Sequence, residues 1–367
     1  MTSLVARVVS FRLGGTDGVS VEALKWERAL RALGFDVRRV AGELLDGARP
    51  GDAALSWLAI DPPASASPSK RALEDAVVDA DLVVVENTCS LPLNPHAART
   101  VARVVERAGV PVVLHHHDLP WQRAATAHVT DLPPDAPHVV HVTINARSRD
   151  ELLTRGFAPA RVVHVPNCFD VDAEPGARDA TRDALGFGPD DLVVLQPTRA
   201  IERKNVPGGL SFATALQREL PDRHVRYWLT GPAEDGYGPT LDALVRGAAV
   251  PVTIGRVGDV ADAYAAADVV VFPSTWEGFG NPLVEATIAR RLVVAGPYPV
   301  RDELAAIGLA APSLDDVDTV VRRLRAPADP TGARNLEAVR RHLSLAMLPD
   351  RLADVLARAV VPEERTA

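Results

Sequence analysis

Two carboxylates stand eight positions apart in the stretch STWEGFGNPLVEA (274–286), with glycines between them. The stretch follows DVVVFPS (268–274), a continuous apolar run that is typical of a buried parallel strand. Asn281 and Pro282 are residue types that cap and open a helix, so a helix is predicted after the glycine loop. A turn of this kind presents free backbone N–H groups to an anion.

The two acids suit different tasks. Glu285, on the predicted helix, can accept two hydrogen bonds from a vicinal diol such as a ribose, and Glu277 in the loop can face a sugar ring. Gly278 and Gly280 allow the backbone to approach a ligand without a Cβ in the way. The alternative is that Glu285 only complements the helix dipole, worth ~0.3–1 kcal/mol, and that Glu277 is a solvated loop acid.

A second stretch, LQPTRAIERKNVPGG (195–209), also follows a predicted strand. Arg199 and Lys204 are five positions apart, and two cations in such a loop suit a diphosphate. The alternative is a solvated basic loop in which these cations pair with Glu202. Both stretches leave the same predicted sheet on the same side, so we expect them to lie together.

The elements that position these loops form an α/β protein. The chain has 367 residues, which favours two domains. A helix is predicted over 19–33, with Gly34 just past its end. Short apolar runs alternating with such helices indicate doubly wound parallel sheets. Strands are predicted at 4–11, 36–42, 81–87, 111–118, 139–145, 161–167, 191–198, 225–232, 251–255, 268–274 and 292–297.

The polar segment 169–191 separates two α/β blocks. We therefore predict an N-terminal Rossmann-like domain over 1–170 and a C-terminal one over 171–345, with a helix at about 346–367 that packs back on the first domain. Two such domains facing each other place a cleft between the carboxyl ends of both sheets, where these folds bind ligands.

Composition narrows the class of protein. The net charge is −8 and the pI is about 5.7, which argues against a nucleic-acid partner. With only Cys89 and Cys168, neither a disulfide framework nor a thiolate zinc site is expected. No signal peptide and no membrane-length apolar run is evident, so we expect a cytoplasmic protein. A membrane-surface contact is possible but has no support in the sequence.

Together these stretches resemble the family-four retaining glycosyltransferases. TWEGFGNPLVEA (275–286) resembles the E-x7-E motif, and RAIERKN (199–205) resembles the phosphate-binding R-x4-K element. GGTDGVS (14–20) resembles the family's N-terminal glycine loop, and VPNCFD (165–170) resembles the segment before its linker. The resemblance spans nearly the whole chain and implies a GT-B fold, with the acceptor bound by the first domain and the nucleotide sugar by the second.

The resemblance also implies roles for individual residues. Arg199 and Lys204 would neutralise the donor diphosphate, Glu277 would contact the transferred sugar, and Glu285 would hold the ribose hydroxyls. The other residues expected to line the donor are Gly15, Gly278, Phe279, Gly280, Asn281, Arg256 and Val257. Two departures stand out: Arg290 and Leu292 replace a glycine and a proline, so the helix should end differently, and Cys168 replaces a glycine.

Three consecutive histidines lie at the end of the strand predicted at 111–118. Alternation puts His115 and His117 on one face and His116 on the other. The resemblance matches His117 and Asp118 to a strand end near the transferred sugar, with His117 among the catalytic residues. A metal site is the rival interpretation, but no cysteine or paired carboxylate accompanies the run at a recognised spacing, and we expect none.

The segment ENTCSLPLNPH (86–96) ends another predicted strand. We expect Glu86, Asn87 and Asn94, together with Asp118, to bind the acceptor, with a structural turn as the alternative. Three Asp-x-Asp pairs, Asp79/Asp81, Asp170/Asp172 and Asp316/Asp318, are interpreted as structural.

The function predicted is transfer of a hexosyl group from a UDP- or GDP-linked sugar to a hydroxyl acceptor, with retention of the anomeric configuration and without a metal or cofactor. The resemblance favours front-face substitution, in which the departing phosphate accepts the acceptor's proton. Two alternatives stay open: a sugar-nucleotide 2-epimerase of related fold, and a non-catalytic two-lobed sugar-binding protein. The sequence names neither the base, the sugar nor the acceptor.

Overall fold

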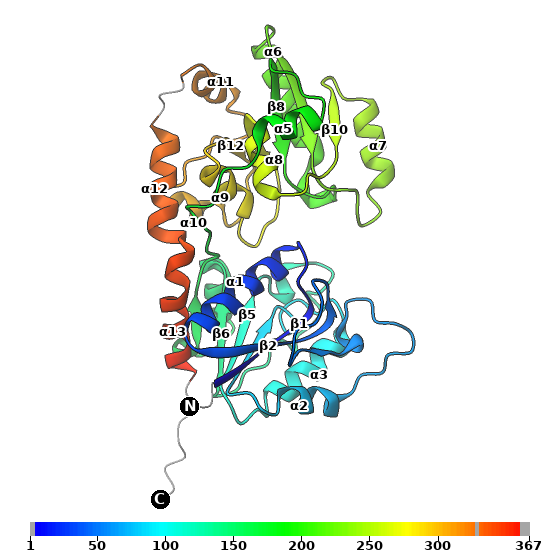
Figure 1. Ribbon diagram of the computed structural model, residues 1–367, viewed down its shortest axis with the longest axis vertical. Coiled ribbons are helices and arrows are strands. Elements are labelled where there is room, and N and C mark those ends of the chain that lie inside the picture. Colours follow the sequence, from blue (N-terminus) through cyan, green and yellow to red (C-terminus); the bar gives the residue numbers. More distant parts are fainter. Residues whose placement is uncertain (1–3, 327–329, 360–367) are drawn as a thin grey trace, which may run out of the picture. The chain divides into compact units, whose positions relative to one another are not determined.

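The computed structural model describes residues 4–326 and 330–359 (Figure 1). These residues form two compact units. The first contains the chain up to Cys168 and again from Leu345, and the second is Phe169–Ser344. The sequence placed these divisions near 170 and 345. None of the described helices is both long and apolar enough to cross a membrane.

The first unit is built on a parallel sheet whose described strands have the order β3-β2-β1-β4-β5-β6-β7. The order reverses between β1 and β4, as it does in doubly wound sheets. The strands are β1 (Leu4–Leu13), β2 (Phe35–Leu44), β3 (Ala53–Ala54), β4 (Leu82–Glu86), β5 (Val112–His116), β6 (Val139–Thr143) and β7 (Val162–His164). The first register pair between β1 and β2 is Leu4 with Phe35, and between β4 and β5 it is Val83 with Val112.

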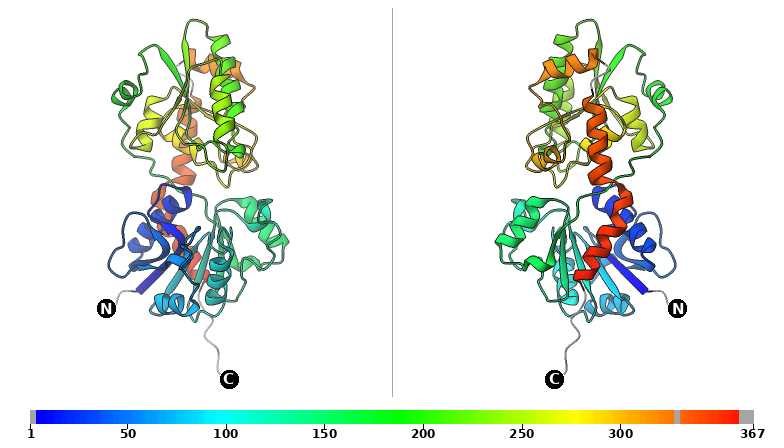
Figure 2. Two further views of the ribbon diagram at one scale, coloured as in Figure 1. Left: turned by 90° about the vertical axis from the view of Figure 1, so that its right-hand side faces the viewer. Right: turned by 90° about the vertical axis from the view of Figure 1, so that its left-hand side faces the viewer.

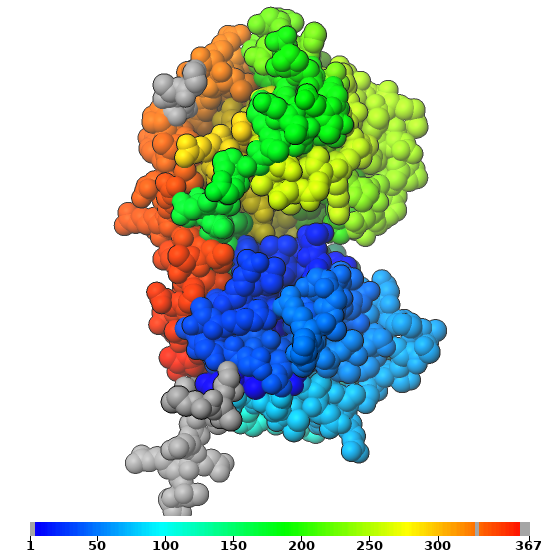
Figure 3. Space-filling view, viewed as in Figure 1, coloured from blue at the N-terminus to red at the C-terminus, as the bar shows by residue number. Residues whose placement is uncertain are grey.

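Helices cover both faces of this sheet. On one face, Trp26 of α1 (Gly18–Ala32) and Leu352 of α13 (Leu348–Arg358) share a core with β1 and β4. Figures 1 and 2 show α13, in red, beside α1 although the two are far apart in sequence, and the space-filling view shows its side chains next to the blue residues of the same unit (Figure 3). On the other face, α2 (Lys70–Val77) and α3 (Pro95–Val105) pack on a second core. The helix α4 (Ala146–Thr154) contacts β6 and β7.

The second unit holds a parallel sheet with the strand order β10-β9-β8-β11-β12 among its described residues, and this order reverses between β8 and β11. Its strands are β8 (Asp191–Gln196), β9 (His224–Leu229), β10 (Val252–Ile254), β11 (Val269–Phe272) and β12 (Leu292–Ala295). Its helices are α5 (Arg178–Ala184), α6 (Val206–Glu219), α7 (Gly238–Arg246), α8 (Val260–Ala266), α9 (Asn281–Ile288), α10 (Arg301–Ala306), α11 (Val317–Arg325) and α12 (Thr331–Leu343). Side chains of α6, α7 and α11 form one core with the sheet.

The predicted strands are all present. The strands β4, β8 and β11 are runs buried on both faces, whereas β10, at the edge of the second sheet, is only partly buried. The two-residue strand β3 escaped prediction, since two alanines carry no strand signal. The predicted helix over 19–33 is α1, and Gly34 follows it with a left-handed φ of +94°. The segment expected to be a polar linker contains a short helix, α5, whose Arg178 and Arg182 both reach Asp268.

The end of α9 corrects the expectation that replacing a glycine by Arg290 changes how this helix stops. Arg290 itself adopts the left-handed conformation, with φ of +57°. The Arg290 N–H donates to the Thr287 carbonyl at 3.0 Å, and the Arg291 N–H donates to the Ala286 carbonyl at 2.8 Å, as in a Schellman end. The helix therefore ends in the turn that a glycine would make, at the cost of a strained arginine.

We predict that Arg290→Gly stabilises the protein by about 0.5–1 kcal/mol, because glycine removes a left-handed penalty of about 1–2 kcal/mol but adds freedom to the unfolded chain. Arg290 is exposed, so little packing is lost. Urea denaturation measures the change. The control is Ala289→Gly in the same turn, where φ is −70° and glycine should destabilise. An Arg290→Gly variant less stable than the parent would contradict this account.

Candidate active site

The two sequence motifs meet at the point where the strand order of the second sheet reverses. The loop after β8 carries Lys204, and the loop after β11 carries Glu277. The Lys204 Nζ donates to Glu277 Oε1 at 2.6 Å, and both side chains are only 12% exposed. A cation and an anion from segments 73 residues apart thus form a nearly buried ion pair.

Arg203 belongs to this site, although it is not one of the two cations predicted to bind the diphosphate. Its guanidinium donates to the Trp276 carbonyl at 3.1 Å and lies 3.4 Å from Glu277 Oε2. Its own carbonyl accepts from the Thr275 N–H at 2.9 Å. Arg203 therefore fastens the loop after β8 to the loop after β11. Its position next to Lys204, in a loop at the end of a strand, is the sequence feature from which its role could have been predicted.

Arg199 is the more accessible cation of the predicted pair. It forms an ion pair with Glu234, which follows β9, and the two side chains are 40% and 38% exposed. The alternative pairing of these cations with Glu202 is wrong, since Arg199 pairs with Glu234 and Lys204 with Glu277. An exposed pair of this kind is worth little and yields readily to a stronger anionic ligand.

The surroundings of Lys204 disfavour its charged form. Burial lowers the pKa of Lys204, and Arg203 and Arg199 act in the same direction, while Glu277 opposes them. The net direction is downward. A further anion near Lys204 would stabilise its charged form, which makes this position suited to a phosphate.

The turn before α9 depends on Gly280. Its φ is +107°, and a Cβ at this position would overlap the hydroxyl of Tyr298. Gly280 occupies the cap position and Asn281 is the first residue of the helix, so the prediction that Asn281 caps α9 is wrong. Phe279 is 5% exposed and its ring stacks on that of Phe169, so its side chain is packed inside the second unit.

Glu285 lies in the second turn of α9. Its Oε2 accepts a hydrogen bond of 2.6 Å from the hydroxyl of Tyr264, a residue of α8 that is 2% exposed. The loop after β10 is held by Gly255, whose N–H donates to the Leu229 carbonyl at 3.0 Å. Arg256 is exposed and Val257 is half-buried in this loop.

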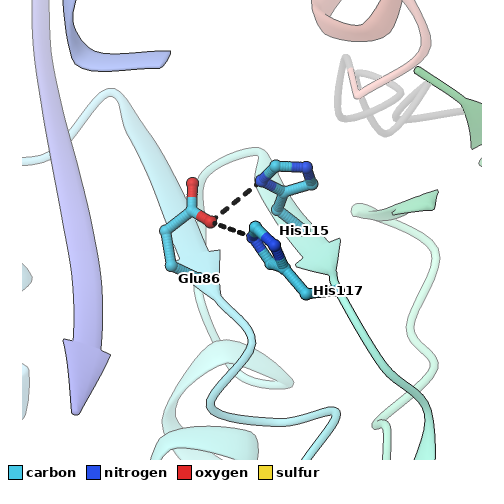
Figure 4. Close-up of side chains that lie close together, drawn as sticks. All are labelled: Glu86, His115 and His117. Atoms are coloured by element: carbon cyan, nitrogen blue, oxygen red, sulfur yellow. Dashed lines mark hydrogen bonds and ion pairs between the residues drawn. The ribbon is translucent and has the colours of Figure 1, made fainter. Parts of the chain in front are cut away.

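The first unit contains a separate buried cluster, formed by Glu86 at the end of β4 and by His115 and His117 at the end of β5. Figure 4 shows one oxygen of Glu86 facing both imidazoles. Glu86 Oε2 lies 2.9 Å from His115 Nδ1 and 3.1 Å from His117 Nε2. Trp26 stacks on His115 with ring centroids 4.0 Å apart. The predicted alternation is confirmed, because His116 faces the other way, toward Ser90 and His141.

The charges of this cluster follow from its burial. Burial alone would raise the pKa of Glu86, but His115 and His117 outweigh it and lower the pKa to about 2. Burial also opposes a charge on His117, yet Glu86, Glu22 and Asp118 raise its pKa. For His115 burial prevails, and its pKa is lowered. Of the two imidazoles, His117 is therefore the one that accepts a proton more readily.

The same three side chains have the chemistry of a metal site. One ligand atom from each of Glu86, His115 and His117 lies within 4.8 Å of the others, and all three residues are buried. The spacing of a histidine pair on one strand face, joined by an acid from the neighbouring strand, was not recognised in the sequence. The hydrogen bonds from both imidazoles to one carboxylate oxygen also satisfy these groups without an ion.

The acceptor-binding residues predicted from 86–96 have internal tasks in the structure. Glu86 is completely buried and anchors the two histidines. The amide of Asn94 donates to the carbonyls of Trp57 and Ala59, and its oxygen caps α3. Both side chains thus have structural roles, and their contact with an acceptor stays a prediction.

Asn87 and Asp118 lie beside the histidine cluster. Asn87 has a left-handed φ of +57°, and its side-chain oxygen accepts from the N–H groups of His117 and Asp118. Asp118 forms an ion pair with Arg123 at 2.6 Å. Gly15 follows β1 at the same edge of the sheet, but the positive φ of that loop belongs to Gly14.

The fold is that of the GT-B glycosyltransferases. Over 96% of this chain and 99% of the other, the structure superimposes with a TM-score of 0.71 and 17% identity on the Anabaena protein Alr3699/HepE, solved in complex with UDP-glucose. Residues 197–325 match the family described as glycosyl transferases group 1, so the chain is a glycosyltransferase with a group 1 domain. The predicted family resemblance and fold class are confirmed.

Curated relatives agree with this assignment. The chain is 27% identical to the mannosylglucosylglycerate synthase of Thermotoga maritima, over 97% of this chain and 99% of the relative. It is 32% identical to the D-inositol 3-phosphate glycosyltransferase of Actinosynnema mirum, over 60% of each. The alternatives of a 2-epimerase and a non-catalytic sugar-binding protein are not favoured.

We predict that Glu86→Gln lowers the pKa of His117 below that of the parent, because burial then acts without the carboxylate charge. Because the pKa of His117 is raised in the folded state, protonation of His117 stabilises the fold. This contribution is fully present below the unfolded-state pKa of about 6.5 and is lost as the pH rises through the folded-state pKa. The variant should lose this pH dependence and about 1–3 kcal/mol of stability at low pH.

Histidine-selective NMR titration and urea denaturation at several pH values measure these two effects. Glu106→Gln, at an exposed acid following α3, is the matched control and should change neither. An unchanged His117 titration in the Glu86→Gln variant would show that the carboxylate does not govern the imidazole.

Proposed function

We propose that this chain is a retaining hexosyltransferase that moves a hexose from a UDP- or GDP-linked sugar to a hydroxyl acceptor. The observation that carries the proposal is the convergence of Arg199, Arg203 and Lys204 with the N-terminus of α9 at the strand-order reversal of the second sheet. Such reversals are where open α/β sheets bind ligands, and cations with helix N-terminal amides suit a diphosphate.

The proposed chemistry rests on stabilising a leaving group. As the bond between the sugar and the diphosphate breaks, negative charge develops on the phosphate oxygen. Lys204, Arg199 and the backbone N–H groups that follow Gly280 would stabilise this charge. In a front-face substitution the departing phosphate oxygen takes the proton of the acceptor hydroxyl while the new glycosidic bond forms, so no side-chain nucleophile is required.

Glu277 would orient the transferred sugar. In the structure it is the partner of Lys204 and Arg203, and a donor diphosphate would compete for the same cations. A carboxylate released from them could accept hydrogen bonds from sugar hydroxyls. Glu285 would hold the ribose, while Gly278, Phe279 and Asn281 would contribute backbone, and Arg256 and Val257 would be near the base.

The first unit would bind the acceptor, and His117 and Asp118 would be the residues that contact the reactants. Asn87 would fix the backbone of both residues through the hydrogen bonds that its side-chain oxygen accepts. The names of two relatives suggest the acceptors to test first, a glucosylglycerate-like glycoside and an inositol phosphate. Both are small polyhydroxylated anions. The cytoplasmic location stays a prediction.

We predict that Arg199→Ala and Lys204→Ala each reduce kcat by about 10²–10³-fold, since each removes a charge that stabilises the departing diphosphate. The rate of hexosyl transfer is measured from the release of UDP or GDP, and thermal denaturation checks that the variants fold. Lys70→Ala, in an exposed pair with Glu74 on α2, is the control and should leave turnover unchanged. Parental rates in both site variants would remove the diphosphate role.

We predict that the product keeps the anomeric configuration of the donor and that transfer continues in millimolar EDTA. Proton NMR of the anomeric signal during turnover gives the configuration, and elemental analysis of the purified protein shows whether the Glu86 cluster carries a metal. Inversion would reject the front-face mechanism. Loss of activity in EDTA, restored by a divalent ion, would assign a metal role instead.

A further inference from the structure

Tyr264 is a buried phenol placed against the acid proposed to bind the pentose. It lies on α8 and is 2% exposed. Its hydroxyl donates to Glu285 Oε2 at 2.6 Å across 21 residues of sequence. This tyrosine lies outside both sequence motifs of the site, and Glu285 needs a partner that holds its carboxylate in place to bind a ribose.

The direction of this hydrogen bond is fixed. Burial raises the pKa of Tyr264 well above its ordinary value, and the neighbouring Glu285 carboxylate raises it further, so the phenol keeps its proton. A protonated phenol facing a carboxylate oxygen can only donate to it. Hydrogen bonds to an ionised acceptor are shorter and stronger than neutral ones. Glu285 is thus held in one orientation on α9 by a rigid side chain of another helix.

We propose that Tyr264 is a positioning residue for Glu285, and that this pair makes the enzyme select ribonucleoside over 2′-deoxyribonucleoside diphosphate sugars. The inference rests on the proposed donor site of the second unit. A carboxylate that is free to rotate can accept hydrogen bonds from other groups when the 2′-hydroxyl of the pentose is missing. A carboxylate fixed toward the pentose loses a partner, and sites built to bind a hydroxyl discriminate strongly against analogues that lack it.

The test is calorimetric titration with UDP, GDP and their 2′-deoxy forms. The parent protein should bind the better ribonucleotide about 10- to 100-fold more tightly than its 2′-deoxy form. Tyr264→Phe should weaken ribonucleotide binding about tenfold and 2′-deoxynucleotide binding much less. In a Glu285→Ala background the same change should have no further effect, because the acid that Tyr264 positions is gone.

Each other outcome is decisive. If Tyr264→Phe weakens both kinds of nucleotide equally, or if its effect is undiminished in the Glu285→Ala background, Tyr264 has only a structural role. Tyr237→Phe, a half-buried tyrosine of the same unit, is the control and should preserve the preference. If the parent binds neither nucleoside diphosphate, the proposed function fails along with this inference, whereas binding with a preference that Tyr264→Phe leaves intact rejects only the inference.

A measurement on the parent protein covers the case in which Tyr264→Phe does not fold. The hydroxyl proton of a buried tyrosine bonded to a carboxylate can be followed by NMR. Its resonance should move on addition of the ribonucleotide and move less with the 2′-deoxy form, since only the former engages both hydroxyls. Equal movement with both nucleotides would overturn the proposal.

Discussion

The ion pair between Lys204 and Glu277 is the interaction on which the second unit's site depends. Strands β8 and β11 are neighbours at the strand-order reversal, and each sends a loop from its carboxyl end. A lysine that is nearly buried is costly without a counter-charge. Glu277 supplies this charge from the opposite loop, and Arg203 ties the two loops together through the Trp276 carbonyl and the Thr275 N–H.

This arrangement links phosphate binding to sugar recognition in the proposed reaction. The cations that would grip a diphosphate are already oriented by an internal acid, so little side-chain ordering is left for the ligand to impose. When phosphate oxygens take over Lys204, Glu277 needs new hydrogen-bond donors. Hydroxyl groups of a sugar attached to the same phosphate can donate these hydrogen bonds. One exchange of partners would therefore recognise both the diphosphate and the sugar of the nucleotide sugar.

The sequence predicted the strands and both charged loops because these features are local: apolar runs, a glycine turn and spaced charges. It could not predict pairings between elements that are separated in sequence. Glu277 as the partner of Lys204, Tyr264 as the partner of Glu285, and Glu86 as the anchor of two histidines all join residues at least 21 positions apart. It also misjudged the end of α9, since local preference disfavours a left-handed Arg290 and only the surrounding structure enforces it.

Glu86 and Glu277 are both buried acids at strand ends, yet their surroundings give them opposite capacities. Glu86 is fully buried, and its Oε2 is shared by the two buried imidazoles of His115 and His117. Breaking these hydrogen bonds would leave the carboxylate and both imidazoles buried without partners. Glu277 is 12% exposed and is paired with the cationic side chains of Lys204 and Arg203, which an incoming anion can satisfy in its place. The first acid therefore serves to fix His117, while the second can exchange its partners during a reaction.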